Sequence, residues 1–129
     1  MPRSDVLAAM EAARKAQESV YYDKCTIISY QEIDDPDTGM DELVEVIEVE
    51  DEPCKLSFET LPAAGSQEDG SVAALQVVKL FISPDVTVNP DSKIIVTRMG
   101  HEYIYKRSGE VHIDPVHQEF KLEPFEEKA

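Results

Sequence analysis

Apolar and polar residues alternate along much of this chain, with the period of two that is typical of half-buried β-strands. The pattern is clearest near the C-terminal end, where one face of a strand is formed by Val116, Gln118, Phe120 and Leu122. The opposite face is formed by His117, Glu119, Lys121 and Glu123. This alternation predicts an antiparallel strand that packs one face on a core and exposes the other to water.

Similar β-rich runs, separated by turn residues, fill the chain from Val20 onward. Other single strands are predicted over residues 24–33, 72–83, 93–99 and 102–107. Residues 42–59 predict two strands, with Pro53 at an edge or a bulge, because proline cannot donate to a central ladder. The sequences DDPDTG and MGHE are typical of turns, and MGHE predicts a tight hairpin. About six or seven short strands in this order favour a small barrel or sandwich.

The N-terminal residues have a different pattern, which predicts a helix. Ser4 is a suitable N-cap, Asp5 lies in the first turn, and the sequence DVLAAMEAARKAQES is rich in strong helix formers. The apolar stripe is weak, since most of its members are alanines that bury little area each. We therefore expect a helix that docks loosely on the core or waits for a partner.

Two prolines, Pro84 and Pro90, separate a long strand from the next one in the segment LFISPDVTVNPDSKIIVTRMG. Proline fixes φ and removes a donor, so both positions suit a chain that leaves one strand and enters another. Apolar residues on either side of the second proline share faces in pairs, which are Val86 with Val88 and Ile94 with Val96. The segment predicts a rigid corner of the framework.

The charge of the 129-residue chain narrows the classes of partner. Twelve Lys and Arg face 27 Asp and Glu, which gives a net charge of −15. Nucleic-acid binding needs a basic patch, so this balance argues against nucleic acid as a ligand. No run of about 18 apolar residues is present, so no membrane span is expected. The two cysteines form no Cys-x-x-Cys pair and no secretory segment precedes them, which indicates a reduced intracellular setting.

Acidic residues gather in two places, and neither has the pattern of a catalytic or metal site. The sequence DDPDTGMDELVE fails the spacing of an EF-hand, since Met40 occupies the position of the required glycine and Val46 that of the bidentate glutamate. The acidic run comprises Glu48, Glu50, Asp51 and Glu52. It lies at a strand end where we expect a solvated face, although weak binding of a divalent cation is an open alternative.

Histidines and cysteines also lack the spacing of a catalytic or metal centre. His112 and His117 are separated more widely than a helical zinc pair, and His101 stands alone in a turn. Cys25 and Cys54 each lie in an apolar-flanked strand and are expected to be small core residues. The sequence therefore predicts a non-enzymatic protein without cofactor or metal, a module that binds other proteins.

The order of these segments resembles the head-closure, or head–tail joining, proteins of tailed bacteriophages, in particular members from PBSX-type phage-like elements of bacilli. The resemblance covers residues 21–125. Its motifs are Ser83-Pro84-Asp85-Val86, Asp91-Ser92-Lys93-Ile94, Gly100-His101-Glu102-Tyr103-Ile104-Tyr105 and His117-Gln118-Glu119-Phe120-Lys121-Leu122. The N-terminal helix has no counterpart among these motifs.

The resemblance implies a small antiparallel β-barrel over residues 21–125. The helix predicted from the residue pattern would precede it over residues 1–20, and a tail over residues 126–129 would follow it. Its function would be to bind beneath the portal in a homo-oligomeric ring, to link head to tail, and to work in the virion neck after assembly in the host bacterial cytoplasm. Portal or adaptor and tail-side proteins would be its partners, and the isolated chain would be a monomer. Within residues 60–71, the partner or channel loop would comprise Leu61, Pro62, Gly65, Ser66, Gln67, Glu68, Asp69 and Gly70.

Two other classes of protein fit parts of the sequence. A free-standing small β-barrel that binds a ligand or peptide would have a lined pocket and would ignore portal protein. A hydrolytic enzyme that uses Cys25 or the acidic run would need convergent side chains in a cleft.

Overall fold

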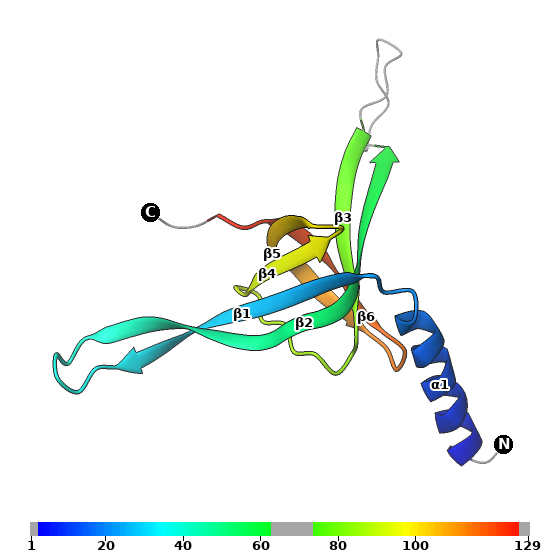
Figure 1. Cartoon of the computed structure of the whole chain (residues 1–129), viewed down its shortest axis with the longest axis horizontal. Coiled ribbons are helices and arrows are strands. Elements are labelled where there is room, and N and C mark those ends of the chain that lie inside the picture. Colours follow the sequence, from blue (N-terminus) through cyan, green and yellow to red (C-terminus); the bar gives the residue numbers. More distant parts are fainter. Residues whose placement is uncertain (1–2, 63–73, 127–129) are drawn as a thin grey trace, which may run out of the picture.

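The computed structural model describes residues 3–126 except residues 63–73 (Figure 1). One helix precedes six antiparallel strands, which close into a barrel in the order β1-β2-β3-β6-β5-β4. The elements are α1 (Arg3–Glu18), β1 (Asp23–Asp34), β2 (Asp41–Pro62), β3 (Ala74–Ile82), β4 (Lys93–Arg98), β5 (His101–Ile113) and β6 (Gln118–Pro124). The expected fold, a mainly β chain with a small antiparallel barrel and an N-terminal helix, is confirmed.

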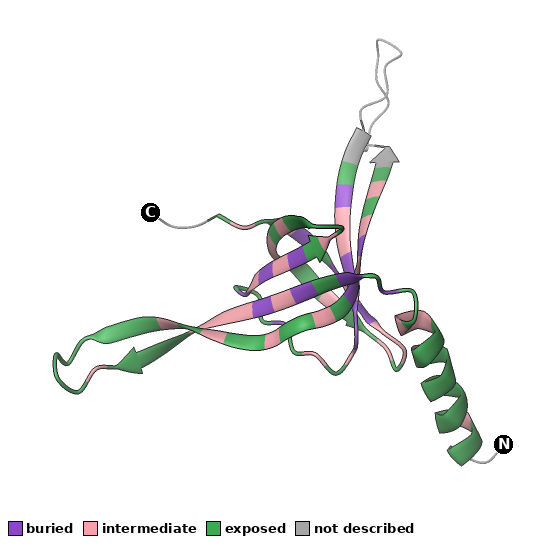
Figure 2. Cartoon of the chain, in the orientation of Figure 1, coloured by how far each residue is buried: buried purple, intermediate pink, exposed green. Residues whose placement is uncertain are grey.

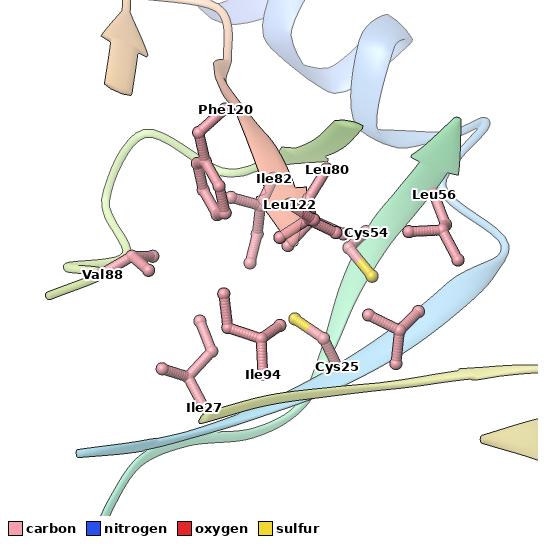
Figure 3. Close-up of a cluster of buried hydrophobic side chains, with 11 residues drawn as sticks. Cys25, Ile27, Cys54, Leu56, Leu80, Ile82, Val88, Ile94, Phe120 and Leu122 are labelled. Atoms are coloured by element: carbon pink, nitrogen blue, oxygen red, sulfur yellow. The ribbon is translucent and has the colours of Figure 1, made fainter. Parts of the chain in front are cut away.

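The core of the barrel is a single cluster of buried side chains (Figure 3). All strands but β5, and the segment between β3 and β4, contribute to it: Cys25, Ile27, Cys54, Leu56, Leu80, Ile82, Val88, Ile94, Val96, Phe120 and Leu122. The residues expected to share faces, Ile94 with Val96 and Val86 with Val88, all pack in or against this cluster. Side chains therefore fill the barrel interior, as is usual for a barrel of so few strands.

The strand β6 shows both the strength and the limit of the alternation pattern. Phe120 and Leu122 are buried, as predicted, and Gln118 on the same face is only 1 % exposed. Its amide Nε2 donates to the carbonyls of Ser83 and Val86, at 2.7 Å and 2.5 Å, so the buried polar group is satisfied. Val116, expected in the same strand, lies outside it, because β6 begins at Gln118.

The prediction of two strands within residues 42–59 is wrong, because β2 runs without interruption from Asp41 to Pro62. Instead of ending, the strand carries bulges. Its pairing with β1 shifts register between Cys25 and Ile28, and Asp51 on the opposite side has a positive φ of 52°. Bulges bend a strand and increase its twist, so β2 can pair first with β1 and then with β3.

The turns follow the local sequence. Met99 and Gly100 join β4 to β5 and have φ of 49° and 83°, the positive values that a two-residue type I′ hairpin requires. In the corner between β3 and β4, Val86 N–H donates to the Ser83 carbonyl and Ser92 N–H to the Asn89 carbonyl. The corner thus contains two turns, residues 83–86 after β3 and residues 89–92 before β4. Each turn includes one of the two prolines.

The helix α1 lies beside the barrel and not in its core (Figure 1). The Arg14 guanidinium donates to Ser83 Oγ and to Asp85 Oδ2, each at 2.6 Å, and it also binds Glu18 on its own helix. Leu7 and Met10 remain exposed. This matches the expectation of a loosely docked helix.

Candidate functional site

The partner or channel loop expected from the sequence falls largely on residues that the structure does not describe. Leu61 and Pro62 are the last two residues of β2, where they pair with Leu75 and Ala74 of β3. The remaining members, Gly65, Ser66, Gln67, Glu68, Asp69 and Gly70, lie outside the described residues. The role given to this loop stays a prediction.

The strands on either side of that loop project from the barrel (Figure 1). β3 pairs with β6 only over Val78–Ile82, whereas it pairs with β2 as far as Ala74. Residues 59–62 and 74–77 thus form a two-stranded ribbon beyond the closed part of the barrel.

A second and longer projection is formed by β1 and β2, and we call residues 29–48 the arm. β1 pairs with β4 only over Lys24–Ile28, and β2 pairs with β3 only from Cys54 onward. From Ser29 to Asp34 the two strands pair with each other alone, and Gly39 with a φ of 69° helps to close the turn at the tip. The arm reaches away from the barrel and is mostly exposed (Figure 2).

Exposed apolar side chains occur on both faces of the arm. Paired residues of antiparallel strands point to the same face. Leu43, opposite Glu32, and Ile47, opposite Ile28, lie on the face that continues the barrel exterior. Ile33 lies on the other face. Their exposed fractions are 64 %, 58 % and 47 %, which is high for large apolar residues in one small element.

The arm and its base account for most of the net negative charge of the protein. Between Lys24 and Lys55 there are eleven acidic residues and no Lys, Arg or His. They are Glu32, Asp34, Asp35, Asp37, Asp41, Glu42, Glu45, Glu48, Glu50, Asp51 and Glu52. At the end of the arm Asp34 lies directly opposite Asp41, and a hydrogen bond between the two carboxyl groups raises the pKa of Asp41.

The acidic run at the base of the arm is solvated, as predicted. Glu48, Glu50 and Asp51 are exposed, and Glu52 is half-buried. Ser29 Oγ donates to Glu48 Oε1 at 2.6 Å, a contact that holds one carboxylate along the ribbon. Within the described part of the chain no group of three or more His, Cys, Asp or Glu is placed to hold a metal ion.

At the junction of β1, β2 and β4 a buried ion pair is covered by aromatic rings. Asp23 is fully buried and accepts hydrogen bonds from Arg98 Nε and Nη2, both at 2.9 Å. Arg98 also donates to the Leu56 carbonyl, and its pKa is raised by the bond to Asp23. The guanidinium carbon lies 5.3 Å from the ring centre of Tyr22 and 5.6 Å from that of Phe58. The cluster fixes the barrel seam and leaves both rings partly exposed.

The two histidines near the C-terminal end meet at the β5–β6 corner. His117 lies between Asp114, whose Oδ2 is 3.3 Å from Nδ1, and Glu119, whose Oε1 is 3.1 Å from Nε2. The ring centres of His112 and His117 are 6.2 Å apart. Hydrogen bonds from the N–H groups of His117 and Val116 lower the pKa of Asp114.

This corner borders a pocket of about 590 Å³ at the irregular pairing of β5 with β6, where the register shifts between Ser108 and His112. Lys79, Glu119 and Lys121 also line it. Lys79 Nζ lies 3.7 Å from Glu59 and 4.0 Å from Glu119. Ion-paired side chains thus form part of the pocket lining. Among the residues that the structure describes, no hydroxyl or thiol is hydrogen-bonded to a histidine.

Cys25 and Cys54 are core residues, as predicted, with exposed fractions of 1 % and 0 %. Their sulfur atoms face one another from neighbouring strands (Figure 3). A hydrogen bond between the thiols, together with burial, raises the pKa of Cys25. An activated cysteine needs solvent access, which burial denies to both thiols.

Sequence reasoning did not foresee the arm. Its signal was present in the alternation of valine and glutamate over residues 43–50, in an acidic segment without any basic residue. This pattern predicts a strand but does not indicate that the strand leaves the barrel. The structure shows that both faces of this ribbon are exposed, so the apolar residues have no core to cover.

Comparisons of the chain with family models, with curated proteins and with solved structures find no match. The described residues include no helix that is long and apolar enough to cross a membrane.

Proposed function

We propose that this chain is a non-enzymatic assembly protein of a phage or prophage virion, a head-closure subunit that binds beneath the portal and links head to tail. In this role the subunits form a homo-oligomeric ring on the portal or adaptor and contact tail-side proteins in the virion neck. The isolated chain is a monomer, assembly takes place in the host bacterial cytoplasm, and no sequence-specific contact with nucleic acid is involved.

One observation carries the proposal: a small, fully packed barrel holds long exposed elements away from itself. The core is confined to the closed part of the sheet, while the arm, the β2–β3 ribbon and α1 extend from it. An isolated two-stranded ribbon is marginally stable in water, so elements of this kind are typical of contacts completed by another molecule.

The sequence motifs that resemble head-closure proteins occupy framework positions. Ser83 to Val86 form the turn after β3, Gly100 to Tyr105 the start of β5, and His117 to Leu122 enter β6. These motifs therefore build the barrel and its corner and do not belong to the arm.

A ligand-binding barrel receives less support from the geometry. The interior is filled by the core cluster, so a ligand would have to bind outside, at the pocket beside His112 or on the exposed rings near Arg98. Binding of a peptide or ligand by a stable monomer that ignores portal protein would favour this alternative.

The direct test is a pull-down of purified portal and neck proteins of the same phage element by the full chain. We expect retention of at least one of these proteins, and a chain that retains none of them refutes the proposal. Deletion of residues 62–70 tests the loop separately. If particles that carry the deletion still keep their DNA and join tails normally, the loop does not act as a gate.

A further inference from the structure

We infer that the arm is a docking element for a different protein, one whose contact surface is basic and also carries apolar side chains. The inference rests on the proposed function for the identity of that partner but not for its chemistry. It assigns to residues 29–48 the contact that a second copy of this chain does not provide.

The arm exposes large apolar side chains that the described part of the chain does not bury. Leu43 and Ile47 are exposed on one face and Ile33 on the other, and Met40 at the tip is 70 % exposed. A two-stranded ribbon gains no core of its own, and within residues 3–62 and 74–126 no third strand pairs with the arm. Large apolar residues that recur on both faces of such a ribbon indicate burial against a partner.

All charged residues of the arm and its base are acidic. The segment from Cys25 to Cys54 contributes −11 of the net charge of −15 and contains no basic residue. Glu45 lies between Leu43 and Ile47 on one face of the arm, and Glu42 lies opposite Ile33 on the other face. A surface that buries the apolar residues of either face must therefore also meet a carboxylate. Complementary positive charge on the partner would satisfy them and would steer the encounter.

A second copy of this chain does not have the charge that would complement the arm. Two arms would repel each other. The rest of the chain carries a net charge of −4, and several of its basic side chains are already paired within the molecule. Arg14 binds Asp85, Arg98 binds Asp23, and Lys106 lies 3.3 Å from Glu123. The rest of the chain thus has no net positive charge with which to receive the arm of a neighbour.

The test uses the full chain and two variants that separate the apolar from the electrostatic contribution. The apolar variant is Leu43→Ser/Ile47→Ser. The acidic variant is Glu42→Gln/Glu45→Gln/Glu48→Gln, in which amides keep the shape of the side chains. Circular dichroism and urea unfolding establish that each variant keeps the barrel.

Matched controls carry the same kinds of change on other surfaces. Ile104→Ser/Ile113→Ser removes two exposed apolar residues of β5, and Glu102→Gln/Glu110→Gln/Glu126→Gln removes three exposed carboxylates outside the arm. These controls distinguish an effect of the arm from a general effect of surface charge or hydrophobicity.

Two probes are used, each by titration with a fluorescent label. The first is a synthetic β-hairpin peptide of alternating lysine and valine, and the second is oligolysine of equal charge. We expect wild type to bind the hairpin more tightly than oligolysine, with an affinity that falls as NaCl rises from about 0.05 to about 0.5 M. Each arm variant should lose about tenfold or more in affinity for the hairpin, and the controls should bind like wild type.

The outcomes separate this inference from the proposed function. If portal and neck proteins ignore wild type but the hairpin peptide binds the arm as described, the proposed function fails and the inference stands. Equal binding of the hairpin by wild type and both arm variants overturns the inference. So does sedimentation that shows oligomers of the wild-type chain alone which disappear in the arm variants, because the arm then contacts a second copy.

Discussion

Replacing Arg98 by methionine should destabilise the barrel more than any substitution on the arm. Methionine keeps an apolar stem between Tyr22 and Phe58 but removes the guanidinium. Asp23, which is fully buried, then loses both hydrogen bonds of 2.9 Å and keeps only the N–H of Leu56, also at 2.9 Å. Breaking a buried ion pair from one side costs about 3–5 kcal/mol. Domains of ordinary size have a total of about 5–15 kcal/mol, so the loss would be a large fraction.

Urea unfolding followed by far-ultraviolet circular dichroism measures this loss as a change in the free energy of unfolding. The double variant Asp23→Asn/Arg98→Met tests its cause. If the cost comes mainly from an unpaired buried carboxylate, the double variant should be more stable than Arg98→Met alone. A loss below about 1 kcal/mol in Arg98→Met, the range of an exposed pair, would refute the reasoning. A double variant with no recovery would refute the proposed cause.

Lys106→Met is the matched control for that experiment. Lys106 Nζ lies 3.3 Å from Glu123 Oε1, and the two side chains are 39 % and 46 % exposed. Exposed pairs contribute at most about 1 kcal/mol, so this variant should unfold close to wild type.

Three further outcomes are expected. The bond to Arg14 lowers the pKa of Asp85 below its ordinary 3.8, so docking of α1 is favoured above that pH and is lost as the pH falls through the lowered value. The NMR signal of the Arg14 Nη2–H group, which donates to Asp85, should follow this change. The pKa of Asp41 is raised above 3.8, so its bond to Asp34 stabilises the end of the arm at low pH and is lost as the pH rises through the raised value. Amide hydrogen exchange at the end of the arm should therefore depend on this titration, and Asp41→Asn should abolish that pH dependence. Pro90→Ala should cost about 0.4–1 kcal/mol in urea unfolding without changing partner binding, because it mainly frees the unfolded chain.

Local patterns predicted the elements of the barrel well because their causes are local. Alternation identified the buried face of β6, and the Met-Gly pair between two apolar runs identified the hairpin of β4 and β5. The assignment of Cys25 and Cys54 to the core followed from their apolar neighbours. Each of these features depends on residues close in sequence, which a reader of the chain can compare directly.

The features that sequence reasoning missed depend on partners far apart in the chain. Asp23 and Arg98 are 75 residues apart, and neither local context distinguishes them from surface residues. The continuity of β2 through Pro53 was also missed. Pro53 pairs with Lys24 of β1 one residue before β2 begins to pair with β3 at Cys54, so only one side of β2 is paired at the proline.

For the candidate site, the sequence drew attention to the loop over residues 60–71, whereas the structure draws it to the arm. Composition explains the difference. Glycine, serine and small residues mark a loop from sequence alone, but an arm of valine, isoleucine and glutamate has the same alternation as a strand in the barrel wall. Only the end of pairing with β4 at Ile28 shows that the arm leaves the barrel.

The residues that stabilise the barrel and the arm that we propose as a docking element lie in different parts of the molecule and differ in charge. The buried pair of Asp23 and Arg98 and the core cluster lie in the closed barrel, while the eleven unbalanced carboxylates lie on the arm and its base. Repulsion among these mostly exposed carboxylates acts mainly on the ribbon that carries them. A basic partner would therefore stabilise the arm as it binds. Substitutions at Leu43 or Glu45 should accordingly change binding and salt dependence while the free energy of barrel unfolding stays near that of wild type.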